Sequence, residues 1–293
     1  MRDGVLLINK PRGVTSTRVV EKVRRRLKTR VGHTGTLDPI ARGLLVLLVG
    51  RATRFSWLFL KMEKSYRVVA LLGITTDTYD VEGEVLETAE VRVDCGEVEN
   101  ALGDFMGEIE QLPPPFSAKK VGGKRAYRLA RKGLKPELKP VRVIVHELRL
   151  ERCEPPEIEL FMRVSSGTYV RSLVHDLGRK LGVGATVKEL IRESVGPFSL
   201  DKSIDLDEFL NSEEPWSYVI PVEDAFSFLP RVSLDYFKGR KVLHGNPVLL
   251  GGEAGDGYVS IYIDSVFVGV GRVESGVLKP ERLLIPEGHQ NLT

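Results

Sequence analysis

The sequence predicts an α+β protein with a mixed, mainly antiparallel sheet and a small additional unit towards the C-terminal end. Long strand-like segments recur without the regular strand and helix alternation of a parallel sheet, several segments have helical spacing, and the last part of the chain holds short Gly-rich strands. With 293 residues, of which 42% are hydrophobic, the chain is long enough to bury one large core and a smaller one. We therefore expect two globular units.

The N-terminal elements follow from local patterns. Gly4 to Asn9 is a predicted strand, and a Lys-Pro-Arg-Gly turn leads from it to a predicted helix at Ser16 to Leu27, with Thr15 or Ser16 as its cap. Leu44 to Val49 is a second apolar run. These elements enclose the polar, Gly-rich segment of residues 28–43.

Apolar and alternating patterns predict the elements in the middle of the chain. The predicted strands are Lys64 to Leu72, its hairpin partner Val81 to Leu86 across a turn at Asp77 to Asp80, Val141 to Arg152 and Ile158 to Val164. The predicted helices are Asp94 to Met106 and Val170 to Leu181, the second of which ends at Gly182.

The acidic stretch Asp201 to Asp224 has no clear period, and we interpret it as a linker. A new unit begins near Phe228. Its predicted elements are a helix at Leu234 to Lys241 and strands at Tyr258 to Ile263, Val266 to Val273 and Leu283 to Ile285. The expected domains are therefore residues 1–227 and residues 228–293.

Charge is segregated along the chain, although the net charge is only +3. Residues 21–30 include six Lys and Arg residues and residues 119–142 are basic, whereas residues 82–110 are mostly acidic. The basic segments suit contacts with nucleic-acid phosphates, but they are equally typical of solvated helix surfaces. Charge alone does not choose between these two interpretations.

Several classes of protein are disfavoured by what the sequence lacks. No apolar run approaches the roughly 20 residues that cross a bilayer, and no signal peptide is recognisable, so we expect a cytoplasmic protein. Cys95 and Cys153 are isolated, and the five His residues have no ligand spacing. The sequence therefore indicates neither a disulfide nor a metal site, and no cofactor is expected.

One carboxylate stands out, in the segment RVGHTGTLDPIARG at residues 30–43. Gly32 and Gly35 can adopt backbone angles closed to other residues, and Pro39 disfavours helix at Asp38. A turn of this kind holds the Asp38 side chain in place and presents it outward. Taken alone, Asp38 is better explained as the cap of a turn or helix.

The surrounding motifs change that balance. In chain order they are LINKPRGVTS at residues 7–16, GHTGTLDP at 32–39, KSYR at 64–67, SGTYVRSLVHDLG at 166–178 and VKELIR at 187–192. Together they resemble the motifs of the TruB family of pseudouridine synthases, over about residues 4 to 200. Several motifs in the same order are far more specific than any one of them.

The resemblance implies a catalytic domain of the pseudouridine synthase type, with Asp38 as the catalytic carboxylate. By the same resemblance Arg171 pairs with Asp38, and Tyr66 stacks on the target uracil. An ionised carboxylate in a dry pocket can attack the base or the ribose, or take a proton from the sugar, and the sequence does not distinguish these routes. A guanidinium nearby favours the ionised form of the carboxylate.

Three further residues receive roles from the resemblance. Tyr169 and Leu190 line the uracil pocket, and His33 sits where the target base leaves the RNA fold. Apart from the resemblance, a Tyr in a strand is more often simple packing, and Arg171 is as well explained by an ordinary ion pair at a helix start.

Two segments bear on how RNA is held. Residues 111–134 join a Pro-rich entry to a basic, helix-capable half, and in TruB proteins the corresponding thumb closes over the T-loop of tRNA; a long surface loop is the alternative. The C-terminal unit resembles a PUA domain, a small RNA-binding β-barrel, through HGNPV at 244–248 and GVGRV at 269–273. By resemblance its target is the acceptor end of tRNA, and a purely stabilising barrel is the alternative.

Three functions remain open at this point. The first is a stand-alone tRNA pseudouridine synthase acting on the T-loop uridine at position 55, with no obligate protein partner. The second is a tRNA-folding factor that binds RNA without needing Asp38. The third is a guide-RNA-dependent synthase of the dyskerin type acting on rRNA, which the thumb-like insertion disfavours.

Overall fold

The structure is a computed structural model, and it describes residues 3–117, 119–121, 123–126, 134, 137–251 and 255–284. A mixed sheet of eleven strands runs through the larger unit in the order β14-β1-β3-β12-β4-β11-β10-β7, with β2, β13 and β15 beside this path. Its strands are β1 (Gly4–Lys10), β2 (Val31–His33), β3 (Arg42–Val49), β4 (Lys64–Leu72), β7 (Gly107–Gln111), β10 (Val141–Glu154), β11 (Glu157–Val164), β12 (Ala185–Val195), β13 (Phe198–Ser199), β14 (Ile204–Asp205) and β15 (Ile220–Pro221). Among the described strand pairs of this sheet, only β1–β14 and β3–β12 are parallel, as expected for a mainly antiparallel sheet.

Short helices cover this sheet. They are α1 (Ser16–Leu27), α2 (Ser56–Leu60), α3 (Cys95–Leu102), α5 (Val170–Lys180), α6 (Leu206–Asn211) and α7 (Val222–Ala225), with 3-10 turns η1 (Gly50–Phe55), η2 (Gly103–Phe105), η3 (Leu200–Lys202) and η4 (Pro215–Tyr218). Helix α1 has the predicted bounds, and the Thr15 side chain accepts a hydrogen bond from the Arg18 backbone N–H at its start. Among the described ranges, no helix is long and apolar enough to span a membrane.

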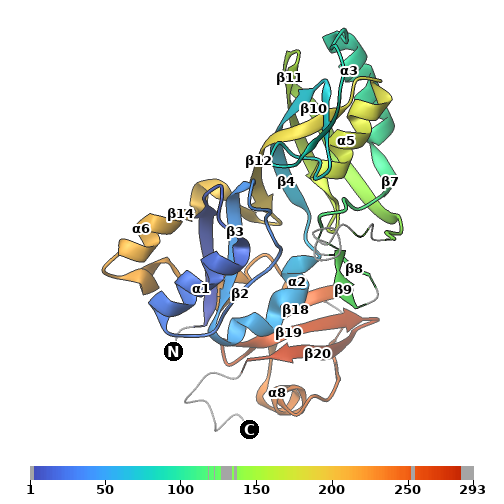
Figure 1. Ribbon diagram of the computed structural model, residues 1–293. Helices are drawn as coiled ribbons and strands as arrows, with labels where there is room; N and C mark the ends of the chain where they lie inside the picture. The colour runs from blue at the N-terminus through green and yellow to red at the C-terminus, as the bar shows by residue number, and fades with distance from the viewer. Residues whose placement is uncertain are drawn as a thin grey trace.

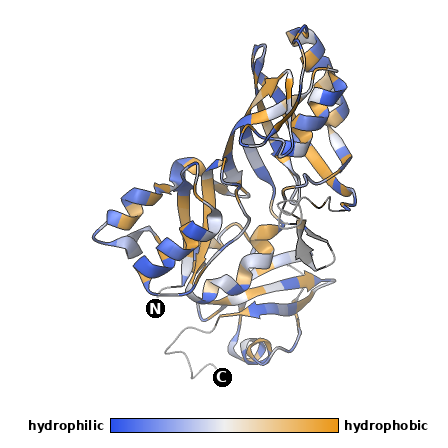
Figure 2. Cartoon of the chain, in the orientation of Figure 1, coloured by the Kyte–Doolittle hydropathy of each residue, from blue (hydrophilic) through white to orange (hydrophobic). Residues whose placement is uncertain are grey.

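Strand β3 shows why one run is apolar throughout. Leu45 and Leu47 belong to a core on the side of α1, whereas Leu44 and Val46 belong to a second core on the other face. A strand with both faces covered loses the alternation of polar and apolar residues. Figure 1 shows the sheet passing from the lobe with β1 and β3 to the lobe with β4 and β10–β12, and Figure 2 shows apolar residues along the strands of both lobes.

The C-terminal unit is a PUA-like five-stranded sheet in the order β16-β18-β19-β20-β17. Its elements are β16 (Arg231–Leu234), α8 (Tyr236–Leu243), β17 (Val248–Leu249), β18 (Gly257–Ile263), β19 (Val266–Glu274) and β20 (Val277–Leu283). It packs against the region of η1 and α2 (Figure 1), where the ring centroids of Phe55 and Phe226 are 4.9 Å apart and those of Phe226 and Phe267 are 5.5 Å apart. The two units therefore share an aromatic core.

Two expectations about connections are wrong. The segment at residues 201–224 is not a linker, because β14 and β15 within it pair with β1 and the side chain of Phe209 is fully buried. The partner of Lys64 to Leu72 is not the segment after the turn either. Instead β4 lies between β11 and β12, while β6 (Val85–Thr88) pairs with the short strand β5 (Ile74–Thr76). The segments close in sequence, β5 and β6, form a separate two-stranded hairpin, whereas β4 pairs in the large sheet with the distant strands β11 and β12.

The expectation for the cysteines is also wrong. Cys95, at the start of α3, forms a disulfide with Cys153 near the end of β10. The two residues are 58 positions apart, and no spacing motif marks them. Only the packing of α3 against β10 brings them together.

Residues 111–134 are described in part. Two short strands, β8 (Lys120–Val121) and β9 (Lys124–Arg125), form a small hairpin. Before the hairpin, the carbonyl of Leu112 accepts a hydrogen bond of 2.7 Å from the Ser172 hydroxyl, so the entry of the segment is attached to α5. Most of the predicted helix-capable second half of this segment, including residues 127–133, lies outside the described residues, as does Ile285 of the last predicted strand.

Candidate active site

Asp38 lies in the loop between β2 and β3. The start of α1 supports this loop, because the Ser16 hydroxyl donates to the Leu37 carbonyl at 2.9 Å and accepts from the Leu37 N–H at 2.8 Å. The backbone N–H of Gly13 donates to the Pro39 carbonyl at 2.7 Å. Two elements before the loop in the chain therefore hold Asp38 in position, while its side chain stays 38% exposed.

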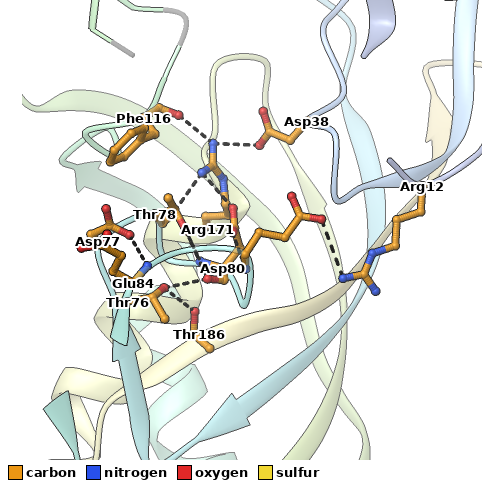
Figure 3. A network of polar contacts seen from close by, with 11 residues as sticks. Arg12, Asp38, Thr76, Asp77, Thr78, Asp80, Glu84, Phe116, Arg171 and Thr186 are labelled. Carbon is orange, nitrogen blue, oxygen red and sulfur yellow. Dashed lines mark hydrogen bonds and ion pairs between the residues drawn. The ribbon is translucent and has the colours of Figure 1, made fainter. Parts of the chain in front are cut away.

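Arg171, in the first turn of α5, reaches the Asp38 carboxylate. Its Nη2 is 2.9 Å from Oδ2 of Asp38 and its Nη1 is 3.1 Å from Oδ2 of Asp80 (Figure 3). The guanidinium also donates to the carbonyls of Thr78 and Phe116, at 2.8 and 3.0 Å. The predicted contact between Arg171 and Asp38 is present, and the four partners leave the guanidinium one orientation.

Asp80 is a residue that sequence reasoning missed. Its side chain is 8% exposed, and its Oδ1 accepts from the Thr78 hydroxyl at 2.8 Å and from the Glu82 N–H at 3.1 Å. The turn that carries it includes Tyr79 at a φ of +62°, an unusual angle for a residue other than glycine. The sequence showed only an acidic turn, because Arg171 is 91 positions away.

A cavity of about 270 Å³ opens beside Asp38. The predicted residues Tyr66, Tyr169, Arg171 and Leu190 line it together with Asp38. The other polar or charged side chains on its wall are those of Thr36, Lys64, Ser117, Ser165, Thr168 and Arg192.

His33 does not share this position. It lies at the end of β2 opposite Leu47 of β3, and it is not among the residues that line the cavity. Gly35 and Thr36, which follow His33 by two and three residues, do border the cavity. The structure thus places His33 near the loop that carries Asp38 but outside the pocket wall.

Tyr169 is held by its backbone. Gln111, 1% exposed at the end of β7, accepts from the Tyr169 N–H at 2.8 Å and donates to the Tyr169 carbonyl at 3.1 Å. Burial raises the pKa of the Tyr169 phenol, so the ring remains neutral at physiological pH. Sequence analysis did not find Gln111, and a single buried Gln leaves no recognisable pattern.

Pairing of β4 with β12 builds the wall opposite Arg171. Tyr66 lies directly opposite Arg192, and Val68 lies opposite Leu190. Directly opposite residues point to the same face of a sheet, as do residues two apart in a strand, so Lys64, Tyr66, Leu190 and Arg192 share one face. This period of two was available in KSYR and VKELIR, and it could have identified Lys64 and Arg192 beside the predicted Tyr66 and Leu190.

Buried positive charge is a second feature of the site. Lys10 is fully buried and Lys64 is 7% exposed, and burial lowers the pKa of each to about 8. The charges of Asp38 and Arg192 act on Lys10 in opposite directions. Within the described ranges, no group of three or more His, Cys, Asp or Glu side chains is placed to hold a metal ion. The cavity therefore combines one carboxylate and several cationic groups with aromatic and aliphatic side chains.

Comparison with known proteins gives matches over almost the whole chain. The pattern described as the N-terminal domain of TruB family pseudouridylate synthase matches residues 23–170, and two TruB C-terminal patterns match residues 171–227 and 230–284. A protein named tRNA pseudouridine synthase B from Aquifex aeolicus is 51% identical over 286 residues, which cover 97% of this chain and 100% of that protein. The chain belongs to the TruB family of pseudouridine synthases.

Other relatives extend the comparison. A tRNA pseudouridine synthase B of Thermotoga maritima is 42% identical over 251 residues, which cover 85% of this chain and 81% of that protein. Among solved structures, a Cbf5-Nop10-Gar1 complex contains a chain with a TM-score of 0.74 and 25% identity, covering 97% of this chain and 85% of that one. The fold is therefore shared between this TruB family member and Cbf5.

Proposed function

We propose that this chain is a stand-alone tRNA pseudouridine synthase, which isomerises the T-loop uridine at position 55 in the cytoplasm. The observation that supports this most strongly is the ion pair of Asp38 with Arg171 at a cavity lined by Tyr66, Tyr169 and Leu190. In the reaction, the bond between C1′ and N1 breaks, the base turns, and C5 bonds to C1′ with loss of the C5 proton. No oxidant or reductant is needed.

The residues have separate roles in this proposal. Asp38 acts on the ribose or the base as the catalytic carboxylate. Arg171 keeps Asp38 ionised when a bound base excludes water, because an opposite charge within about 4–6 Å favours the charged form. Stacking on Tyr66, worth roughly 1–3 kcal/mol, helps to offset the cost of extruding the base. Tyr169 and Leu190 bound the space that the uracil occupies.

The remaining segments assist RNA binding in this proposal. His33, beside the catalytic loop, lies where the target nucleotide leaves the T-loop. Residues 111–134 act as a thumb over the T arm, supported by the attachment of the segment to α5. Residues 228–293 contact the acceptor end, as a domain distinct from residues 1–227. The tRNA is the only partner required.

Two alternatives have specific discriminating features. The shared fold with Cbf5 favours a guide-dependent rRNA synthase, but relatives up to 51% identical over nearly their full length are named for tRNA. A tRNA-folding factor would need a tRNA surface but no buried network around Asp38. Activity on bare tRNA, without guide RNA or protein partners, separates the stand-alone synthase from both alternatives.

The test is tritium release from a tRNA transcript that carries 5-tritiated uridine. Wild-type protein should release one equivalent per tRNA, because bond formation at C5 expels the label. Asp38→Asn should bind tRNA equally well and release none. Release by Asp38→Asn at the wild-type rate would refute the role of Asp38, and no release by wild type would refute a stand-alone synthase.

A further inference from the structure

Lys64 and Arg192, which we call the cationic wall, have no part in the ion-pair network around Asp38. Both line the cavity, and they are 7% and 2% exposed. Lys and Arg are almost never fully buried unless they are paired. Within the described part of the chain, neither forms an ion pair with a carboxylate, whereas Arg171 contacts two. The cationic wall is therefore buried positive charge without a counterion among the residues that the structure describes.

The cationic wall lies beside the ring that we assign to base stacking. Arg192 is directly opposite Tyr66 in the sheet, and Lys64 precedes Tyr66 by two residues in β4. All three side chains consequently point to the same face. A uracil stacked on Tyr66 would have one cation on the neighbouring strand and another along its own strand.

Hydrogen bonds to the backbone explain only part of why Lys64 and Arg192 are buried here. Nζ of Lys64 donates to the carbonyls of Leu60 and Met62 at 2.9 and 2.5 Å, and Arg192 donates from Nε to Leu44 at 2.8 Å and from Nη2 to Gly35 at 3.1 Å. These bonds hold the cavity wall together, but neutral donors could make them without the cost of burying charge.

Donor capacity also remains on both cations. An ammonium has three N–H groups, and only two carbonyls accept from Lys64. Nη1 of Arg192 has no hydrogen-bond acceptor among the described residues, and it lies 3.7 Å from the point where a Cβ on Gly35 would be. Gly35 itself borders the cavity. The absent side chain at Gly35 keeps the space next to Nη1 open.

The charge balance of the cavity indicates what the cationic wall complements. Three cationic side chains line the cavity, namely Lys64, Arg171 and Arg192, against one carboxylate, Asp38. The substrate base is uncharged, so the excess positive charge does not match it. Breaking the bond between C1′ and N1, however, leaves the bonding electron pair on the ring, and the detached uracil is an anion with charge on N1, O2 and O4.

We propose that the cationic wall stabilises the detached uracil anion between bond cleavage and bond formation. The inference rests on the proposed function and adds two catalytic residues to it. Fixed charges in a water-excluded site act most strongly on charge that develops during the reaction. C5 then attacks C1′, which removes the negative charge from the ring. The C5 proton leaves, the electron pair of the C–H bond restores the ring, and N1 takes up a proton, so that the product base is neutral.

The experiment compares Lys64→Met and Arg192→Met with wild type in single turnovers, on tRNA containing uridine and on tRNA containing 5-fluorouridine. Cleavage of the N-glycosidic bond is followed after rapid quenching. On uridine each variant should lose about 10²–10³-fold in rate. Fluorine withdraws electrons and stabilises the uracil anion itself, so the loss should be several-fold smaller on 5-fluorouridine. Equal losses on both substrates would overturn the proposal.

Three controls keep the test decisive. Arg67→Met removes a cation from the opposite face of β4 and should leave the ratio between the two substrates unchanged. If the Met variants fail to fold, Lys64→Arg and Arg192→Lys, which keep the charge, should retain the wild-type ratio between substrates, and a ratio shifted by them would contradict the proposal. A wild-type protein that makes no pseudouridine refutes the proposed function, whereas active variants with unchanged rates refute only the cationic wall.

Discussion

On the two faces of the sheet at strand β4, the cationic side chains have different kinds of partner. On the solvent face, Arg67 donates to Glu193 at 2.9 Å and to Glu159 at 3.1 Å. On the cavity face, Lys64 and the neighbouring Arg192 of β12 donate to backbone carbonyls and have no carboxylate partner among the described residues. The cations on the solvent face therefore have carboxylate partners, whereas the two on the cavity face line the cavity that Asp38 also borders.

The balanced face extends across neighbouring strands. Arg149 is 3.1 Å from Glu151, and Arg163 is 2.8 Å from Glu63. Paired, exposed charges of this kind each contribute about 0–1 kcal/mol to stability and keep the uncovered sheet soluble. Charge that water can solvate is inexpensive to place, whereas buried charge carries a desolvation cost. The contrast therefore distinguishes the cavity face from the solvent face.

Replacing Arg171, the cation that contacts both Asp38 and Asp80, should have the largest effect on stability and turnover. Arg171→Met leaves the buried carboxylate of Asp80 without its partner, which should lower the free energy of unfolding by about 3–5 kcal/mol and abolish turnover. Urea denaturation measures the first effect and tritium release the second. Arg171→Lys is the control, and it should recover part of the stability but little activity, because an ammonium cannot keep both carboxylates and two carbonyls as partners. Full stability in Arg171→Met would contradict the importance of the network.

Neutralising Asp80 should have the next largest effect. Asp80→Asn preserves the shape but removes one of the two carboxylates that hold Arg171, so we expect a loss of about 1–3 kcal/mol in stability and at least about tenfold in turnover. The Glu82→Gln variant is a suitable control, because Glu82 contacts Arg12 at 3.9 Å on the exposed surface. Wild-type turnover in Asp80→Asn would show that Arg171 needs no second carboxylate.

The pH dependence of stability should separate the two faces. Burial lowers the pKa of Lys64 to about 8, while an unfolded Lys titrates near 10.4, so the unfolded state binds more protons between these values. The contribution of Lys64 to the free energy of unfolding must therefore increase, so that the folded state becomes more stable, as the pH rises from about 8 towards 10.4. Lys64→Met should lose this rise.

Chemical denaturation at a series of pH values measures the effect. Lys188→Met is the matched control, because Lys188 of β12 is paired with Glu157 and its side chain is 40% exposed. Its pH curve should run parallel to that of wild type. A parallel curve for Lys64→Met as well would mean that Lys64 keeps its proton in the folded protein throughout this range.

The smallest effect is expected on the solvent face. Arg67→Met should change the free energy of unfolding by no more than about 1 kcal/mol, and the change should shrink at high salt, since exposed charges are screened. Thermal or urea unfolding at low and high salt measures it. A loss of several kcal/mol would show that the network on this face acts cooperatively.

Local sequence patterns predicted much of the fold. Helix α1 has the predicted bounds, and β1, β4, β10, β11 and α5 agree with their predictions to within a few residues, because caps and apolar periods act over short distances. The ordered motifs also indicated the contact of Asp38 with Arg171. The acidic stretch misled us, since β14 and β15 are too short to show a period and form only by pairing with β1.

The sequence by itself determined the family, the identity of the catalytic carboxylate as a prediction, and the elements that carry the site, because these depend on contiguous motifs. Tertiary structure alone decided which charges meet. Asp80 reaches Arg171 across 91 positions, and Cys95 reaches Cys153 across 58. It also decided that Arg192 lies opposite Tyr66, since strand register is a property of the assembled sheet. Burial and pairing, which set the electrostatics of the site, arise only when distant segments pack together.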